Sequence, residues 1–481
     1  MIGILIIAGI IVLAFILVLQ SNKLMNVVTN LYGVIITVLG AYGLFFISEP
    51  LFFMNENLRV DTLSFYEILI AGLIFWFAAL YAKGYVENLI TAGELNPKNV
   101  KLFYLAFNGL LLSLVLAFSS NNLALLWIFA ELSTILSAIL IVLLNAKENI
   151  VAAMKYVFIT SIAMIFSFLG LILLYTVTKY NLGIATLNWD ILLENASILP
   201  PELFIMSLVL FFIGFAAKAG LVPFHIWLPA AHSKAPSNVS AILSGTVINV
   251  GTYALIRIFA IAKQNPDSFH FASILFLVFG VLTIGVAAFS MVTRTNLKKL
   301  IAFSSVEGVG LIVLGLGIGS SNAIFWVLFL IGTNALVKAL LFFSAGIIHR
   351  QYLSIKIDAI HNLFDLQPLS AVGLIIGSLA LIGMPFLPVF MPKLLLLSEL
   401  ARSSIILMFI VLLLMLVVAS SFVIFLLQII NVKEKLLTKY HAPISMKLPI
   451  IILLIIIFLL GITMPETLQN VLHSIIVQLG W

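Results

Sequence analysis

The sequence contains no cysteine, and charged residues are scarce in it. Without thiolates the chain cannot ligate an iron–sulfur cluster through cysteine, and it cannot form a disulfide. Only 9% of the 481 residues are charged, against about 25% in a soluble domain, while 63% are hydrophobic. We therefore expect a polytopic membrane protein with no nucleic-acid partner, because basic cytoplasmic loops account for a net charge of +6.

The sequence also lacks the motifs of a stand-alone enzyme. No glycine-rich nucleotide loop is present. His225 and His232 are separated by Pro229 and have no clear third ligand, which is not the pattern of a metal site. We predict no catalytic residue, no metal and no cofactor in this chain.

Apolar runs long enough to cross a membrane follow one another along the chain. A spanning helix needs about 20 apolar residues, and this template predicts an all-α fold with about fourteen spans. They lie near 2–20, 27–47, 63–82, 102–119, 122–144, 151–176, 203–230, 237–260, 272–292, 300–318, 322–347, 368–400, 404–430 and 447–466. The seventh and the twelfth are predicted to be broken, at Gly220, Pro223, Pro385, Pro388 and Pro392.

The two broken spans indicate an internal inverted repeat. Each carries a lysine near its break, Lys218 in one and Lys393 in the other. Paired discontinuous helices are typical of inverted repeats in transporters. The expected parts are N-terminal helices 1–3 in 1–100, a first five-helix repeat in 101–260, a second in 272–430, and a last helix in 431–481.

The basic residues predict the orientation. With the N-terminus outside, most lysines fall in inside loops, including Lys433 and Lys435 in the loop 431–446. The outside set is small: Arg59, Lys179, Arg257, Lys263 and Arg402. Basic residues accumulate on the cytoplasmic side, so we expect a multi-pass protein of the cell (inner) membrane with both termini outside.

A glutamate and a lysine in the first half are candidates for proton transfer. Glu131 lies in the fifth span and Lys218 in the seventh, and we expect them to face each other. Burial disfavours the charged form of a lysine, and a nearby carboxylate favours it. A lysine whose partner approaches and retreats can therefore load and release a proton. The alternative is a structural ion pair.

Three more charged residues extend this polar line through the second half. Lys338 lies in the eleventh span, Lys393 at the break of the twelfth, and Glu307 in the tenth. The alternatives are that Lys393 extends toward the interface and that Glu307 pairs with the nearby Lys298 and Lys299. His225 and His232 flank the first break and fit a proton inlet, because histidine titrates near neutrality. His349 is expected in an inside loop.

Three motifs resemble the antiporter-like membrane subunits of the respiratory complex I superfamily. The first comprises Lys218, the segment 223–232 (PFHIWLPAAH) and the segment 235–241 (APSNVSA). The second is 297–305 (LKKLIAFSS), and the third is 334–346 (NALVKALLFFSAG), with His349 after it. Residues 127–131 (WIFAE) are similar to the glutamate motif of the fifth helix in that family.

This resemblance implies a proton half-channel in each repeat and a row of charges at mid-membrane, with Glu131, Lys218, Lys338 and Lys393 as relay residues. Glu307 and His349 are accessory. The motifs look more like the hydrogenase-linked branch, which includes membrane-bound [NiFe] hydrogenases and sulfur-reducing complexes. Two relay positions are neutral: Asn249 stands where the family has a lysine, and Asn334 where it has a histidine. The second break also departs from the family pattern, since 383–390 reads GMPFLPVF.

The resemblance implies a proton-translocating subunit of a redox-driven complex. The expected partners are other membrane subunits, lipid, and a hydrophilic arm that carries NiFe and Fe–S centres. Two alternatives stay open. One is a subunit of a multi-subunit sodium/proton antiporter, and the other is a scaffold subunit without transport of its own, which Asn249 and Asn334 favour.

Overall fold

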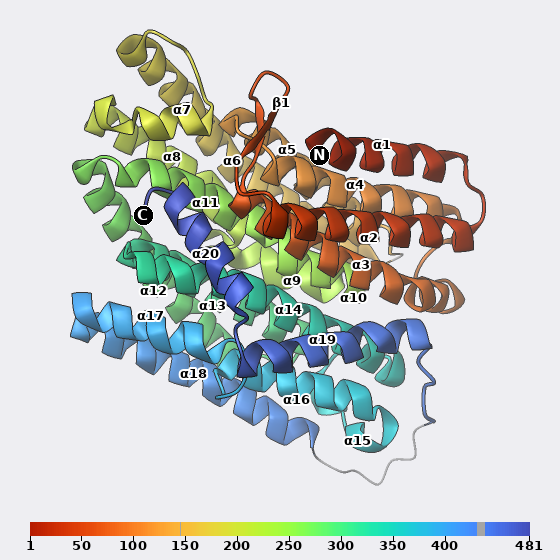
Figure 1. The fold of residues 1–481 in the computed structure, drawn as a ribbon. Coiled ribbons are helices and arrows are strands. Elements are labelled where there is room, and N and C mark those ends of the chain that lie inside the picture. Colours follow the sequence, from red (N-terminus) through yellow and green to blue (C-terminus); the bar gives the residue numbers. More distant parts are fainter. Residues whose placement is uncertain (145, 431–437) are drawn as a thin grey trace.

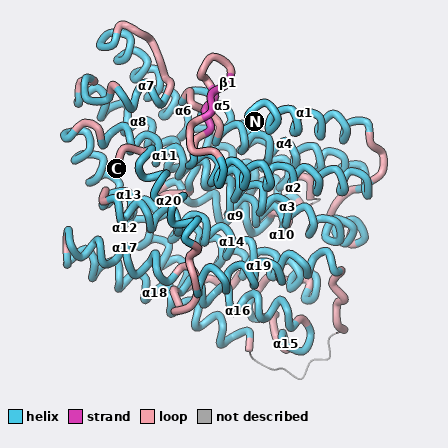
Figure 2. The backbone as a smooth tube through the Cα atoms, in the orientation of Figure 1, coloured by secondary structure: helices cyan, strands magenta, loops and turns pink. Residues whose placement is uncertain are grey.

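The computed structural model describes residues 1–144, 146–430 and 438–481. Lys433 and Lys435, two of the predicted inside basic residues, lie outside the described residues. Long helices run side by side through the molecule (Figure 1) and make up nearly all of its regular structure (Figure 2). The polytopic, all-helical fold class predicted from the sequence is confirmed.

The helices have the following bounds. The first half contains α1 Ile2–Val18, α2 Asn22–Phe46, α3 Thr62–Thr91, α4 Val100–Phe118, α5 Leu123–Val142, α6 Lys147–Leu182, α7 Trp189–Glu194, α8 Pro201–Ala219, α9 Trp227–Lys234, α10 Ser237–Ile242 and α11 Ile248–Lys263. The second half contains α12 Pro266–Val292, α13 Leu297–Ile318, α14 Ser321–Tyr352, α15 Leu363–Leu366, α16 Pro368–Ile382, α17 Phe390–Ser403, α18 Ile405–Ile429, α19 Ile444–Ile462 and α20 Glu466–Gln478. A π-helical turn, Leu243–Val247, joins α10 to α11.

Among the described residues, 12 helical stretches are long and apolar enough to cross a membrane. Two shorter apolar helices, α1 and α16, occupy the regions of the predicted first and twelfth spans. The total of fourteen spans and the inverted repeat stay predictions.

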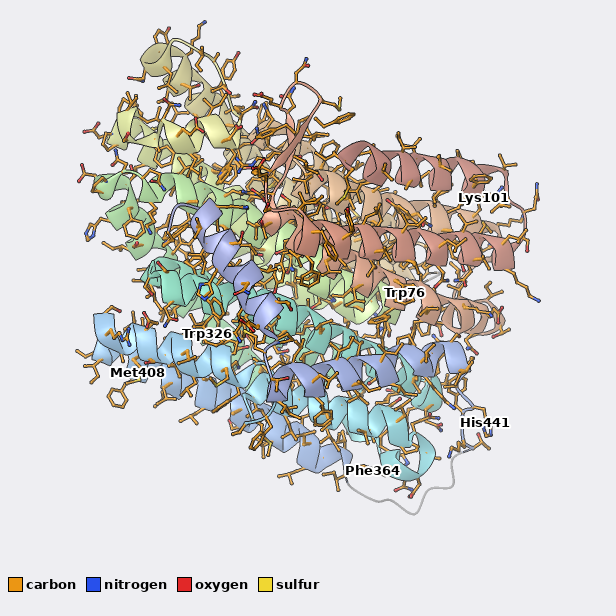
Figure 3. The ribbon with its side chains drawn as sticks, in the orientation of Figure 1. Trp76, Lys101, Trp326, Phe364, Met408 and His441 are labelled. Carbon is orange, nitrogen blue, oxygen red and sulfur yellow. The ribbon has the colours of Figure 1, made fainter. Side chains whose placement is uncertain are left out.

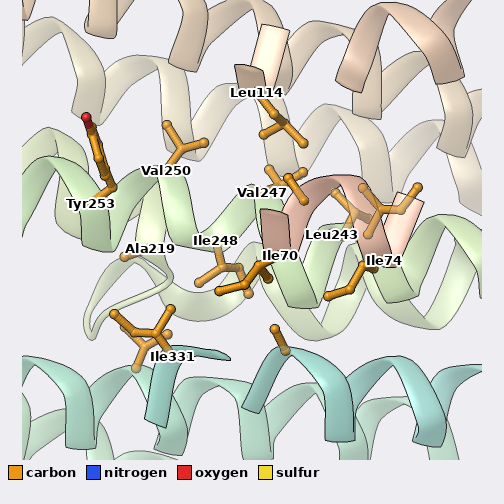
Figure 4. Close-up of a cluster of buried hydrophobic side chains, with 14 of the residues drawn as sticks. Ile70, Ile74, Leu114, Ala219, Leu243, Val247, Ile248, Val250, Tyr253 and Ile331 are labelled. Carbon is orange, nitrogen blue, oxygen red and sulfur yellow. The ribbon is translucent and has the colours of Figure 1, made fainter. Parts of the chain in front are cut away.

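The burial of the helices separates a core from a lipid-facing shell. The apolar stretches of α10–α11 and α13 are almost entirely covered by protein, whereas most of α19 is not. Figure 4 shows aliphatic side chains from α3, α4 and α14, such as Ile70, Leu114 and Ile331, around the π-helical turn and α11. The exposed Ile, Leu and Phe side chains of α6, α12 and α18 fit a lipid solvent, in which apolar surface carries no penalty.

Both predicted helix breaks are present, and each begins at a glycine. Gly220 ends α8 with φ +82°, and Gly383 ends α16 with φ +91°. Only glycine adopts this left-handed region without a steric penalty. Pro385 and Pro388 lie in the gap before α17, whereas Pro392 lies in the first turn of α17, where a missing N–H breaks no helical hydrogen bond.

Several elements were not predicted from the sequence, among them the short helices α7 and α15, a hairpin and the last helix. A small hairpin pairs β1 (Leu51–Phe53) with β2 (Leu58–Val60) in the loop before α3. The C-terminal helix α20 crosses obliquely over the long helices (Figure 1) and contacts α2, α3 and α14. Its end is held by Trp481, whose Nε1 donates to the carbonyl of Gly319 at 2.9 Å. No helix was predicted after residue 466, because α20 is short and half polar.

A buried ion pair ties the start of α3 to α11. The Arg257 guanidinium donates two hydrogen bonds of 2.7 Å to the Asp61 carboxylate, and its carbon lies 4.3 Å from the Trp189 ring centroid. Arg257 was assigned to the outside basic set, but it is 4% exposed inside α11. The pair therefore serves as a packing contact between helices.

We expect Asp61→Asn to lower the free energy of unfolding by about 3 kcal/mol, because it leaves the buried Arg257 charge unpaired. Arg257 would keep its bonds to Tyr253 and Ser64 but lose its counter-charge. Denaturant unfolding in detergent measures the change. Asp267→Asn at the exposed start of α12 is the matched control, and an equal effect of both substitutions would show that burial of the pair is irrelevant.

Candidate functional site

Lys218 is fully buried near the C-terminus of α8, just before the first break. Its Nζ atom donates to three oxygens of α5: the Ala130 carbonyl at 2.8 Å, Ser133 Oγ at 2.7 Å and Thr134 Oγ1 at 2.6 Å. Gly251 of α11 allows close approach at this point, because a Cβ there would lie 2.5 Å from the backbone nitrogen of Ala219. The ammonium group is thus held by neutral oxygens inside the bundle.

The expected contact between Lys218 and Glu131 is not formed. Among the described residues, no ion pair within 4 Å joins them. Glu131 points toward α6 instead, where Ser161 Oγ donates to its Oε2 at 2.8 Å. Successive helix residues are rotated by about 100°, so Glu131 lies on a different face of α5 from the three oxygens that bind the lysine.

Asn249 contacts a carboxylate that was not among the predicted site residues. Asn249 Nδ2 donates to Oε2 of Glu67 at 3.0 Å, and Glu67, on α3, is 1% exposed. Glu67 is the one acidic residue in the apolar run 63–82, so its position in a predicted span was the signal that could have found it. The neutral residue Asn249 in α11 is therefore hydrogen-bonded to a buried carboxyl group.

The second half holds a buried ion pair. Lys393 Nζ donates to Oε1 of Glu307 at 2.9 Å and to the Leu381 carbonyl, and both charged side chains are at most 5% exposed. Two alternatives that the sequence left open are not observed. Glu307 pairs with Lys393 and not with Lys298 or Lys299, and Lys393 is buried and does not extend to the interface.

Lys338 and Asn334 lie next to this pair on α14. Lys338 Nζ donates to Ser304 Oγ of α13. A Cβ on Gly308 would lie 2.5 Å from Nδ2 of Asn334, so the glycine leaves room for the amide. Ser305 on α13 in turn contacts Ser244 of the π-helical turn, Oγ to Oγ at 2.8 Å. Polar side chains thus connect the two halves.

The histidines occupy three different environments. His232 is fully buried and stacks on Phe342 of α14, with ring centroids 4.9 Å apart, and neither ring nitrogen has a partner among the described residues. His225 is partly exposed, 6.2 Å from the Phe303 ring. His349 is not a loop residue as expected: it lies in the last turns of α14 and lines a cavity.

Lys101 and His441, which were predicted to face inside, lie at one end of the bundle, and Met408 lies at the opposite end (Figure 3). We call the end with Lys101 and His441 the basic end. The described residues contain no group of three or more His, Cys, Asp or Glu side chains that could hold a metal ion.

Comparison with known proteins identifies the family of this chain. The family model described as "NADH:quinone oxidoreductase/Mrp antiporter, TM" matches residues 120–419. The chain belongs to this family. Glu131, Lys218, Glu307, Lys338 and Lys393 all lie in the region that matches the antiporter family model, whereas Glu67 precedes it.

Relatives of this antiporter-family chain come from several kinds of complex. It is 30% identical over 390 residues to the hydrogenase-4 component F homolog of Methylacidiphilum infernorum, covering 80% of this chain and 81% of the relative. It is 29% identical to a Na(+)/H(+) antiporter subunit of Alkalihalophilus pseudofirmus, covering 61% of this chain and 58% of that relative.

Solved structures show the same fold. A chain of the archaeal membrane-bound sulfane sulfur reductase superposes with a TM-score of 0.87 at 22% identity, covering 99% of this chain and 97% of that one. A chain of the Mrp complex from Dietzia sp. DQ12-45-1b superposes with a TM-score of 0.86 at 17% identity, with the same coverage. At these identities the likeness concerns the fold alone.

Proposed function

We propose that this antiporter-family subunit conducts protons through the cell membrane within a redox-driven complex, with Glu131, Lys218, Lys338 and Lys393 as relay residues. One observation carries the proposal. A row of titratable side chains crosses the bundle from α5 to α17 through α8, α13 and α14. Lys218, Glu307, Lys338 and Lys393 are buried, and Glu131 at the start of the row is partly exposed. Charged side chains inside a membrane are costly and mark ion pathways.

Several buried polar atoms have no hydrogen-bond partner among the described residues, and this supports water bridges between the relay residues. The atoms without a partner among the described residues include Glu67 Oε1, Glu131 Oε1, both ring nitrogens of His232, both side-chain polar atoms of Asn238, and Ser344 Oγ. Such atoms are normally satisfied by ordered water. Water bridges would carry a proton past Asn249 and Asn334, which cannot hold the charge themselves.

The two halves hold their lysines in different ways, and this difference suggests how the charge moves. Lys393 is paired with Glu307, whereas Lys218 is bound by neutral oxygens while Glu131 points away. A charge change in a neighbouring subunit would draw Glu131 toward Lys218 or release it, so that Lys218 loads or loses a proton. The coupling must supply about 2.3 kcal/mol per charge for each 100 mV of membrane potential.

The inlet is proposed to run from the basic end through His232. His232 stacks on Phe342, one helical turn from Lys338 on α14, so it is placed to load Lys338. From the sequence, His225 and His232 together were predicted as a proton inlet beside the first break. His225, beside the first break, stays a candidate for a second entry.

We expect His232→Gln to slow proton translocation by roughly tenfold, which corresponds to about 1.4 kcal/mol on the barrier. Glutamine keeps a polar group of similar size but does not titrate. Proton uptake into vesicles that carry the assembled complex measures the rate. His270→Gln at the exposed start of α12 is the control, and an unchanged rate in the His232 variant would remove this histidine from the pathway.

Copurification from native membranes with a tag on this chain tests the proposed function. A partner arm that carries nickel and iron–sulfur centres would support the redox-driven complex. The hydrogenase-4 relative favours this outcome. Small membrane partners without any cofactor would instead support the second candidate, a sodium/proton antiporter component, which the similarity to the Alkalihalophilus relative favours.

A further inference from the structure

A cavity of about 590 Å³ opens at the basic end, between the ends of α3, α9, α13 and α14. None of the relay residues Glu131, Lys218, Lys338 and Lys393 lines it, whereas the accessory residue His349 does. Its polar lining comes from several chain segments and includes Tyr85, Glu94, Ser233, Lys234, Asn296, Lys298, Lys299, His349, Ser354 and Lys356. Four of these side chains are lysines and one is acidic, so the lining is strongly basic.

The existing ion pairs do not neutralise this lining. Glu94 is already paired with Arg350, Nη2 to Oε2 at 2.8 Å. Lys234 reaches Glu148 at 3.4 Å, but 72% of the Glu148 side chain is exposed, so that pair is weak. Among the described residues, no ion pair is formed by Lys298, Lys299 or Lys356.

Lys298 places a buried positive charge in the wall of the cavity. Its side chain lines the cavity although the residue is only 3% exposed, and its Nζ makes one hydrogen bond, 3.0 Å to the Ala235 carbonyl. An ammonium group has three protons to donate, and a buried charge requires a counter-charge. Two donors of Lys298 are therefore free to bind an anion.

The start of α13 brings a further donor to this cavity, the backbone N–H of Lys298. Leu297 N–H donates to the Ile355 carbonyl and Lys299 N–H to Asn296 Oδ1. No acceptor among the described residues is found for the N–H of Lys298. A free amide at a helix N-terminus attracts anions, and this one belongs to the buried lysine itself.

We propose that this cavity binds a phosphate group, held by Lys298, Lys299 and the start of α13, with Lys356 at the rim. A phosphate offers several charged oxygens to donors that approach from different helices, and charge-assisted hydrogen bonds to such oxygens are strong. Either free inorganic phosphate or the headgroup of an anionic phospholipid carries this chemistry. Basic pockets between helices at the cytoplasmic side of membrane proteins take such headgroups. The proposal does not depend on proton conduction.

The test uses the full chain in phosphatidylcholine nanodiscs. Potassium phosphate is titrated against potassium chloride at equal ionic strength, and the midpoint of thermal unfolding is followed. A second preparation contains phosphatidylglycerol and no phosphate. We expect a saturable rise of the midpoint with phosphate, with phosphatidylglycerol, or with both, because a ligand of the native state stabilises it. The preparation in which the midpoint rises shows whether free phosphate or a lipid headgroup is bound.

Lys299→Gln is the main variant, since Lys299 is partly exposed and its loss should not impair folding. We expect it to weaken the apparent affinity by about tenfold, as loss of one charge-assisted bond does. Lys298→Met is the second variant. The control is Lys179→Gln, which changes an exposed lysine in the last turn of α6 that does not line the cavity. Absence of a rise in both arms, or an equal response of wild type and Lys299→Gln, would overturn the proposal.

Discussion

Replacing Lys218 with alanine is expected to reduce proton translocation by the assembled complex at least about a hundredfold, equal to about 2.7 kcal/mol on the barrier. Without the ammonium group, the Ala130 carbonyl, Ser133 Oγ and Thr134 Oγ1 have no cation to bind. Both hydroxyls also donate to the Ala130 carbonyl, so α5 is expected to stay folded. The measurement is acidification of inverted membrane vesicles on addition of the electron donor.

Two control variants make this result specific. Lys179→Ala removes an exposed lysine from the last turn of α6 and should leave the rate unchanged. Lys218→Arg keeps a cation but cannot release its proton, so it should also stop translocation. If pumping survives in Lys218→Ala combined with Glu131→Gln, the chain is a scaffold subunit, and transport runs through other subunits.

Breaking the buried Glu307–Lys393 pair on one side is expected to destabilise the protein by roughly 3–5 kcal/mol, because an unpaired charge stays inside the bundle. Glu307→Gln keeps an oxygen that can accept from Lys393 but removes the counter-charge of this buried ammonium group. The variant that combines Glu307→Gln with Lys393→Met carries neither charge, so it should be more stable than either single variant. Unfolding in detergent measures all three variants.

This double-mutant cycle separates the energy of the Glu307–Lys393 interaction from the cost of burying each charge. The exposed pair Lys234–Glu148 is the matched control, since 39% and 72% of its side chains are exposed and such pairs contribute at most about 1 kcal/mol. Additive losses in the Glu307 and Lys393 variants would mean that the two side chains do not interact in the membrane. The pair would then have to be removed from the proposed pathway.

The sequence was sufficient for features that depend on local chemistry. Apolar runs of spanning length and the scarcity of charge predicted the membrane fold, because the hydrocarbon thickness sets the length of a spanning helix. Gly220 and the prolines Pro223, Pro385 and Pro388 predicted the two breaks, because these residues constrain the backbone locally. The burial of Lys218 and Lys338 also followed, since each lies in an apolar run, whereas the sequence left open whether Lys393 is buried.

Only the tertiary structure decided which partners these charges have. Glu131 is adjacent in sequence to a residue that binds Lys218, yet its own carboxylate faces α6. Lys393 meets Glu307 and Asn249 meets Glu67 across long stretches of chain. The sequence determined which membrane-spanning segments carry charged residues. The rotation and packing of each helix determined which groups it meets there, because a contact between helices depends on both faces at once.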